Sequence, residues 1–389
     1  MNEWRQSTWG DEVTLEYGKA LGDYSDTVGS VRVFGTNGPI GWTDTALAQG
    51  PGVILGRKGA YRGVHYSPEP FFVIDTAYYV VPKAKLEMRW LYYAIIHHQL
   101  GLIDDGSPIP STTRAAVYPR AIIVPPPAEQ RAIAGVLGAL DDKMEQNRRT
   151  AQALERLARA IFRAWFVDFE PVKAKAAGAT TFPSMPQPVF DALPTRFVDS
   201  DIGPVPEGWD VLRLDGLLTL QRGFDLPKQS RTDGSHPIFA ASGLNGLHSE
   251  WKVRGPGVTT GRSGVLGQVF FVDRDFWPLN TSLWVKEYKR SNPWHAYFLL
   301  QTLDLAQLNA GSAVPTLNRN HVHSLPIVAP PANLLQAFKR VSSLTFSLDQ
   351  QTRDESDKLA TMRDYLLPKL LSGDVRVRSA LTETGMSSD

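Results

Sequence analysis

Two glycine-rich stretches of the chain contain cationic side chains in a setting that suits contact with a phosphate or a base edge. Gly50–Gly59 reads GPGVILGRKG, and Gly255–Gly264 reads GPGVTTGRSG. Small neighbours let the backbone approach a ligand closely, and an arginine can hold a phosphate or bond a guanine through two hydrogen bonds. These stretches therefore predict contact with nucleic acid. A glycine-rich turn that only fixes the fold of each half explains them equally well.

Further candidates follow from where the two halves differ. If each half reads a different sequence, its base contacts should lie where the halves diverge, which favours Lys58, Arg62, Arg222, Lys228 and Arg231 over the shared Arg57 and Arg262. The candidate DNA-binding residues are Arg57, Lys58, Tyr61, Arg62, Arg222, Lys228, Arg231, Arg262 and Ser263. The loops Gly106–Arg114 and Gly311–Arg319 add Ser, Thr and Asn side chains that could contact phosphates, although turn chemistry accounts for this composition equally well.

The two stretches belong to an internal repeat with an offset of 205 residues, from Gly50 to Gly255. Further matches occur in the same order, the last after a one-residue slip: 75–76 with 280–281, 106–111 with 311–316, Arg114 with Arg319, and 124–127 with 328–331. Four ordered blocks at one offset indicate a tandem duplication, and its long period indicates two domains rather than a solenoid.

Each half begins with a predicted globule rich in Gly, Pro and aromatic residues, at residues 1–125 and 206–330. Short β-forming runs bounded by turn residues are typical of a mixed β-rich domain. The runs are 52–55, 71–74, 77–81, 121–124, 268–272 and 282–285. We expect helices near 90–100 and 294–305 to join them.

Each half then continues into one long predicted helix, at 126–170 and 331–376, because apolar residues recur there at alternating steps of three and four. The first stripe is Ile133, Leu137, Leu140, Met144, Asn147, Ala151, Leu154, Ala158, Ile161 and Trp165. The second is Leu334, Phe338, Val341, Thr345, Leu348, Thr352, Glu355, Leu359, Met362, Leu366 and Leu370. Helices with one stripe each need a partner, and the obvious partner is the other helix.

The predicted fold class is therefore α+β: two mixed β-rich domains separated by two long antiparallel helices, with a pseudo-twofold internal repeat. Residues 171–205 are expected to form a linker, and 377–389 a disordered tail. The outward cations Arg148, Arg149, Arg156, Arg159 and Arg163 could bind partner subunits or line DNA, while a solvated basic face is the alternative.

Composition narrows the classes of function. The chain has 389 residues, no cysteine, and a net charge of +1 from 41 basic and 40 acidic residues. It therefore offers no disulfide framework and no thiolate site. Its N-terminus lacks a signal-peptide pattern, and no run reaches the roughly 18 apolar residues of a membrane span. A protein that holds DNA only by neutralising phosphates is usually more basic, so either the basic groups act locally or the chain is no DNA binder.

Several of these stretches, in this order, resemble type I restriction-modification specificity (S) subunits, over residues 1 to about 376. They are Gly50–Gly59, Pro125–Gln130, Leu154–Phe166, Pro206–Trp209 and Leu366–Gly373. One departure is that Pro-Glu-Gly-Trp opens only the second half, whereas the first half starts more abruptly at Ser7-Thr8-Trp9.

Two different domains separated by two long helices predict an asymmetric bipartite target, with one half-site per domain and the helices setting the spacer. The absence of cysteine suits a reducing cytoplasm. The resemblance implies a non-catalytic subunit that binds double-stranded DNA. It also implies two methyltransferase (M) subunits and, in some assemblies, two restriction/translocase (R) subunits. S-adenosylmethionine and ATP with Mg²⁺ would bind those partners, and no cofactor would bind this chain. Consistently, the sequence lacks both a Gly-x-x-x-x-Gly-Lys-[Ser/Thr] loop and a Gly-x-Gly-x-x-Gly fingerprint.

A fused restriction-methylation enzyme is a rival class, but the sequence lacks the methyltransferase and nuclease motifs that such an enzyme needs. The pair His321-x-His323 could point two imidazoles the same way on a strand, but no third ligand lies nearby, so we expect no metal site. The adjacent His97 and His98 lie in an expected helix and face different directions. A coiled-coil adaptor with two protein-binding heads would also fit the near-neutral charge.

Overall fold

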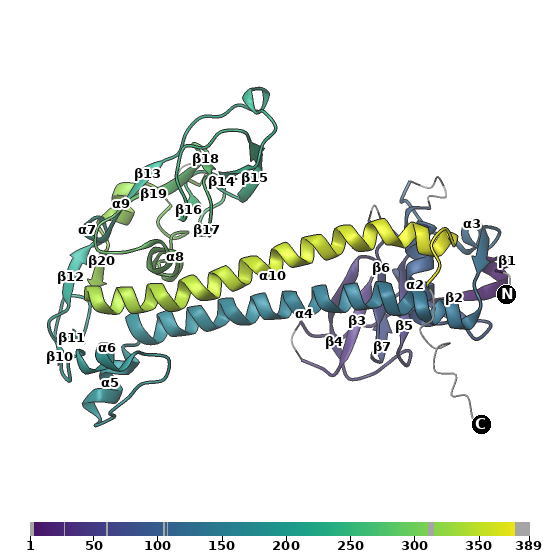
Figure 1. The fold of residues 1–389 in the computed structure, drawn as a ribbon, viewed down its shortest axis with the longest axis horizontal. Coiled ribbons are helices and arrows are strands. Elements are labelled where there is room, and N and C mark those ends of the chain that lie inside the picture. The colour runs from purple at the N-terminus through teal and green to yellow at the C-terminus, as the bar shows by residue number, and fades with distance from the viewer. Residues whose placement is uncertain are drawn as a thin grey trace, which may run out of the picture. The chain divides into compact units, whose positions relative to one another are not determined.

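The computed structural model describes residues 4–26, 28–59, 61–103, 106, 108–309 and 315–377. The chain forms two compact units, the first made of Met1–Arg148 with Arg353–Asp389 and the second of Arg149–Thr352. The two long helices α4 (Pro127–Phe166) and α10 (Ala332–Ser372) each contribute a segment to both units (Figure 1). The sequence-based boundaries at 125 and 330 separate the helices from the globules, whereas in the structure each globule includes helix segments in its core.

The first unit contains three sheets and short helices. A four-stranded antiparallel sheet has the order β2 (Val13–Tyr17), β8 (Ala77–Pro82), β5 (Gly52–Gly56), β6 (Val64–Ser67). A three-stranded sheet has the order β4 (Gly38–Thr43), β3 (Val31–Gly35), β7 (Phe71–Val73). The remaining elements are the strand pair β1 (Arg5–Thr8) and β9 (Ala121–Val124), and helices α1 (Trp9–Glu12), α2 (Met88–His97), η1 (Leu100–Leu102) and α3 (Arg114–Val117).

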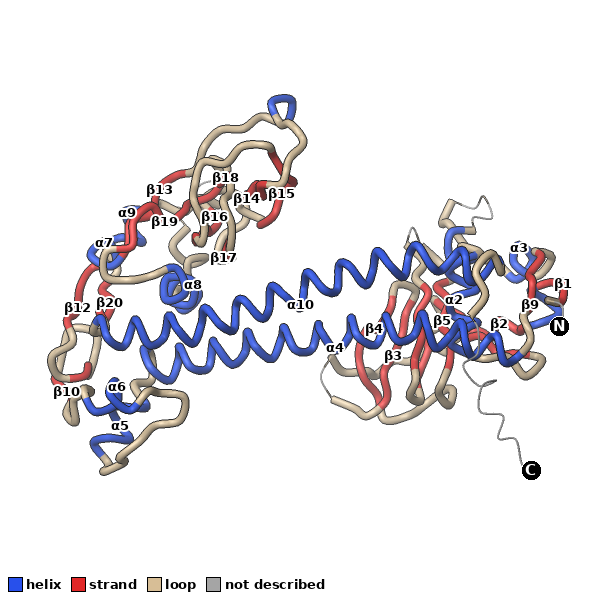
Figure 2. Tube along the Cα trace, viewed as in Figure 1, coloured by secondary structure: helices blue, strands red, loops and turns tan. Residues whose placement is uncertain are grey.

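The second unit repeats this topology. Its four-stranded sheet has the order β13 (Leu218–Arg222), β19 (Ser282–Tyr288), β16 (Gly257–Gly261), β17 (Val269–Val272). Its three-stranded sheet has the order β15 (Gly243–His248), β14 (His236–Ala240), β18 (Trp277–Pro278). The pair β12 (Asp210–Arg213) and β20 (Pro326–Ala329) matches β1 and β9, and the helices are α7 (Leu214–Leu217), η2 (Lys228–Ser230), α8 (Pro293–Thr302) and α9 (Arg319–His323). The predicted duplication is confirmed strand by strand, and Figure 2 shows strands and loops making up most of each globule.

The repeat extends further toward the N-terminus than the sequence motifs suggest. β1 pairs with β9 from Arg5 to Thr8, as β12 pairs with β20 from Asp210 to Arg213, at the same offset of 205. Trp4 thus takes the place of Trp209, the last residue of Pro-Glu-Gly-Trp. The expectation that the first half starts abruptly at Ser7 is therefore wrong. Only the tryptophan of the motif is shared between the halves, and one matching residue is too little to detect in the sequence.

The seam of α4 follows the predicted stripe, whose ten residues are all buried or half-buried. The prediction for the middle of α10 is wrong at three positions, since Leu348, Glu355 and Met362 are exposed. Their C-terminal neighbours Asp349, Ser356 and Arg363 are half-buried instead. The apolar residues are too sparse there to set the phase of the stripe.

Hydrogen bonds set that phase within the first unit and show that the helices are antiparallel. Arg363 donates to Asp141 at 3.0 Å, and the buried Asn147 amide donates to Glu355 at 2.8 Å and to Ser356 at 3.3 Å. As α4 advances from 141 to 147, its partner positions on α10 therefore recede. Polar pairs of this kind fix the register of paired helices at some cost in stability.

Each unit has its own main core, which includes side chains from both long helices. Leu137 and Leu370 are buried in the first core, and Phe162, Trp165 and Phe338 in the second. The predicted linker holds the short helices α5 (Glu170–Ala176) and α6 (Gln187–Asp191) and the strand pair β10 (Phe197–Val198) and β11 (Val205–Pro206), and it also packs into the second core. In the described part of the chain, no helix is long and apolar enough to cross a membrane. The predicted tail from 378 onward lies outside the described residues.

We expect Phe338→Ala to lower the free energy of unfolding by about 3–5 kcal/mol, because a fully buried ring is lost and a cavity remains. Phe338 contacts the rings of Phe162, Trp165 and Phe166. Urea unfolding followed by tryptophan fluorescence measures the change. Leu344→Ala on the same helix is the control, since that side chain is 72% exposed. Equal midpoints for the two variants would contradict the packing described.

Candidate nucleic-acid interface

The shared arginine of the two glycine-rich stretches makes the same structural contact in both units. Arg57 Nη2 donates to the carbonyl of Asp75 at 2.9 Å, and Arg262 Nη1 donates to the carbonyl of Asn280 at 3.3 Å. The Arg57 guanidinium also lies over the Tyr17 ring at 5.0 Å. These contacts are those of a residue that fixes a loop, and a DNA role for Arg57 and Arg262 stays a prediction.

The two predicted loop regions of each half come together in space. Gly59 N donates to Pro110 O at 3.0 Å, and Gly264 N donates to Pro315 O at 2.9 Å. Both glycines have positive φ, +110° and +94°, which favours glycine at this turn. In the second loop, Gly311–Val314 lie outside the described residues. The two segments that the sequence singled out in each half therefore lie side by side, paired through their backbones.

Arg62 is buried and its donors are used within the protein. Nε donates to Gly101 O at 3.0 Å and to Thr112 Oγ1 at 3.1 Å, Nη1 donates to Gly59 O at 2.6 Å, and Nη2 donates to Ile103 O at 3.0 Å. It therefore ties three chain segments together. A group held in this way has little capacity left for a base, so Arg62 is the weakest of the predicted DNA contacts.

The remaining candidates differ in how available their side chains are. Lys58 is exposed, and the Tyr61 side chain is 79% exposed. Arg222 lies 3.7 Å from Asp225, which offsets part of its charge. Lys228 is exposed on η2. Ser263 is half-buried, and its backbone N–H donates to Thr281 O at 3.1 Å.

Arg231 is positioned beside an exposed strand. Its Nη1 donates to Asn245 on β15, to the carbonyl at 2.8 Å and to the side-chain oxygen at 3.0 Å. Sequence reasoning did not single out Asn245, nor Arg32, whose guanidinium lies 4.5 Å above the Trp42 ring. Comparing the two halves at the 205-residue offset could have found them, because Trp42 and Ile40 correspond to Leu247 and Asn245.

All five cations predicted on the outer face of α4 are exposed. Three of them form ion pairs with nearby carboxylates: Arg148 with Glu145 at 2.7 Å, Arg159 with Glu155 at 2.8 Å, and Arg163 with Asp168 at 2.8 Å. Exposed pairs of this kind contribute little to stability and leave the groups accessible. A partner-binding role for these residues, and for Arg149 and Arg156, stays a prediction.

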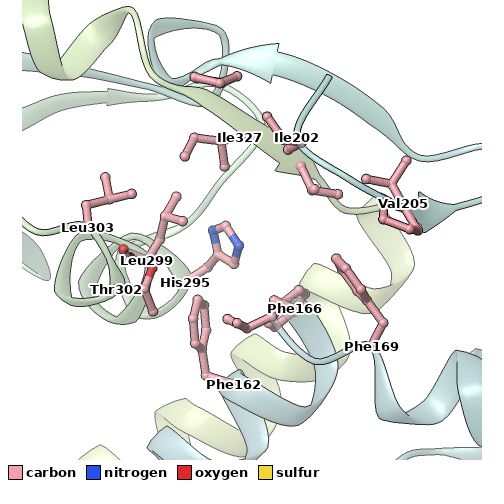
Figure 3. A pocket seen from close by; sticks show the side chains of 14 residues that line it. Phe162, Phe166, Phe169, Ile202, Val205, His295, Leu299, Thr302, Leu303 and Ile327 are labelled. Carbon is pink, nitrogen blue, oxygen red and sulfur yellow. Dashed lines mark hydrogen bonds between the residues drawn. The ribbon is translucent and has the colours of Figure 1, made fainter. Parts of the chain in front are cut away.

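An apolar pocket of about 230 Å³ lies within the second unit, and its lining includes Phe162, Phe166, Val205, Leu299 and Ile327 (Figure 3). His295 points into it and is the one titratable side chain among the lining residues. Its Nδ1 bonds Ser291 Oγ at 2.8 Å. Burial lowers the pKa of His295 to about 3, so the ring is neutral at pH 7.

The remaining histidines form no metal centre in the described chain, where no three His, Cys, Asp or Glu side chains are grouped for one. His321 and His323 both lie on α9 and not on a strand, so residues two apart do not share one face. His323 Nε2 accepts a hydrogen bond from Leu220 N at 2.9 Å and so joins α9 to β13. His97 ends α2 and His98 caps it, as the predicted helix requires.

The chain contains a tandem pair of β-rich heads. Each head is completed by segments of two long antiparallel helices and presents paired glycine-rich loops. This arrangement defines a duplicated recognition protein. The family model described as type I restriction modification DNA specificity domain matches residues 22–156 and 206–353. The chain therefore belongs to the family of type I restriction-modification specificity subunits.

Individual relatives agree with this assignment. The MjaIX specificity subunit of Methanocaldococcus jannaschii is 23% identical over 333 residues, covering 77% of this chain and 71% of the relative. The HindI specificity subunit of Haemophilus influenzae is 23% identical over 378 residues, covering 78% and 81%. Among solved structures, the type I restriction-modification S subunit from M. genitalium has a TM-score of 0.64 at 17% identity, covering 95% of this chain and 96% of that one. The last comparison supports the fold.

The contacts of Arg62 and Lys58 generate opposite expectations for two variants. We expect Arg62→Met to lower the free energy of unfolding of the first unit by about 1–3 kcal/mol, because buried carbonyls lose their hydrogen-bond donor. Lys58→Ala should change stability by less than about 0.5 kcal/mol, because its side chain is exposed. Differential scanning calorimetry of both variants tests this, and equal losses would show that Arg62 does not tie the loops together.

His295 predicts a pH dependence of the second unit. Below pH 6.5 the unfolded chain takes up a proton at this residue that the folded chain does not. Stability is therefore fully present above pH 6.5 and is lost as the pH falls toward 3, by about 1.4 kcal/mol per pH unit. Urea unfolding between pH 7 and 5 should show a steeper loss for the wild type than for His295→Phe. Parallel pH profiles would mean that His295 is solvated in the folded chain.

Proposed function

We propose that this chain is the DNA-reading subunit of a type I restriction-modification complex and that it recognises an asymmetric bipartite target. The observation that supports this most is the duplicated head with divergent surface residues. Two copies of one topology can present the same framework to DNA, while different side chains read different bases. One half-site per head follows, and the two half-sites should differ in sequence.

The long helices are proposed to set the length of an unread spacer between the half-sites. α4 has 40 residues and α10 has 41, so each is about 60 Å long at 1.5 Å per residue. The polar contacts between Asn147 and Glu355 and between Asp141 and Arg363 fix the register of the pair, which a measuring element requires. Spacing set by the geometry of a protein is familiar from dimers that read two separated half-sites.

Catalysis is proposed to reside in partners. Two methyltransferase subunits would bind this chain, and two restriction/translocase subunits would join in assemblies that cleave DNA. S-adenosylmethionine and ATP with Mg²⁺ would bind those partners in the cytoplasm. The near-neutral charge of +1 fits this division, because a basic surface on the partners can add phosphate contacts to those of this chain. The cations on the outer face of α4 are candidate contacts for the methyltransferase.

Co-expression with the neighbouring methyltransferase, followed by genome-wide mapping of methylated bases, tests the proposal. We expect one motif made of two short, different half-sites across a fixed gap, and we expect it to vanish when this chain is deleted. Binding of the complex to a duplex with that motif should weaken steeply with salt. Methylation that persists unchanged without this chain would overturn the proposal and favour an adaptor with protein-binding heads.

A further inference from the structure

The edge strands β4 and β15 occupy the same place in the two heads. Each lies at the end of the three-stranded sheet, beside β3 or β14. The pairing shifts register at the same point of both hairpins, between Val33 and Phe34 and between Pro237 and Phe239. Gly38 and Gly243, which open the strands, both have positive φ, +118° and +105°. The backbone of this hairpin is therefore the same in both heads.

The side chains on this shared frame differ. β4 contains Pro39-Ile40-Gly41-Trp42, and β15 contains Leu244-Asn245-Gly246-Leu247. All four of the latter residues are exposed, Leu244 to 64% and Leu247 to 53%. An exposed edge strand with apolar side chains promotes unwanted pairing unless something covers it. A common frame with different side chains is what two heads need to read two sequences.

Charged groups at these strands favour DNA as the occupant. Arg32 is the cross-strand partner of Trp42 and stacks on its ring, and within the described chain its guanidinium has no hydrogen-bond acceptor. In the second head, Arg231 holds the carbonyl and the side-chain oxygen of Asn245. The Asn245 side chain is exposed, and its amide nitrogen has no acceptor in the described residues. Arginine reads guanine, and asparagine reads adenine, through hydrogen bonds to the base edges.

We propose that the β3–β4 and β14–β15 hairpins are the base-reading elements of the two heads, with Arg32 on β3 and Asn245 on β15 as residues that determine specificity. Arg231 acts as a positioning residue for Asn245. A two-stranded ribbon fits the major groove of B-DNA, so each hairpin can present these side chains to one half-site. On β4 it is the side chains and not the strand edge that are available, because the backbone of Trp42 is bonded to Ser25. This inference rests on the proposed function, because it assumes that each head reads one half-site.

Methylation mapping of the co-expressed complex tests the inference through reciprocal variants. Asn245→Ala should relax one or two base positions in one half-site, with discrimination at those positions falling about tenfold to a hundredfold. Arg32→Ala should relax positions in the other half-site only. Arg231→Ala should relax the same positions as Asn245→Ala, more weakly. No prior assignment of half-sites to heads is needed, because the two main variants must affect different ones.

Lys286→Ala is the matched control, since it removes an exposed charge from β19 in the same head; both half-sites should stay unchanged. Asn245→Ser keeps a small polar side chain at this exposed position, so it should fold like the wild type. It should relax the same base positions as Asn245→Ala, which would show that the effect of Asn245→Ala does not come from misfolding. If the wild type yields a bipartite motif while Asn245→Ala and Arg32→Ala leave both half-sites intact or alter the same one, the reading-strand inference is overturned and the proposed function stands. If the wild type yields no motif that depends on this chain, the proposed function itself fails.

Discussion

The structure depends on the burial of one apolar stripe on each long helix. A 40-residue helix with a single apolar stripe gains most of its stability from packing of that face. The stripe of α4 is buried against α10 and against both globules. Leu137 lies in the first core, and Phe162 and Trp165 lie in the second. Neither head has a complete core without the helix segments.

This dependence explains why the compact units cut across the segments that sequence distinguishes. Residues at the N-terminal end of α4 pack with residues at the C-terminal end of α10 in one unit, and the opposite ends pack together in the other. Polar contacts rather than apolar area set the register where the stripe of α10 is weak. The cluster around Asp141, Arg363 and Tyr93, whose hydroxyl donates to Asp141 at 2.6 Å, joins both helices to α2 of the first head. Burial and the hydrogen bond to Asp141 raise the pKa of Tyr93, so its hydroxyl keeps its proton and remains a donor.

Cations in this protein serve two purposes that residue type alone does not distinguish. Arg57, Arg62 and Arg262 donate to backbone carbonyls, and Arg62 does so while buried. Their role is to hold glycine-rich loops whose backbone has few side-chain contacts of its own. Arg32 stacks on an aromatic ring, and Arg231 orients an amide. Guanidinium groups suit all of these tasks because they combine a fixed fork of donors with a flat face.

The sequence by itself determined the duplication, the α+β class, the two long helices and most of the strands, because these follow from local periodicity and from matches at one offset. It also located the paired glycine-rich loops. The tertiary structure alone decided which arginines are structural and which side chains of the hairpins are exposed. It also decided the phase of α10, where polar partners from α4 override a weak apolar pattern, and the helical place of His321 and His323. Burial, hydrogen-bond partners and register arise from segments distant in the chain, such as Arg62 with Ile103 or Asn147 with Glu355, and no local pattern encodes which distant segment will supply the partner.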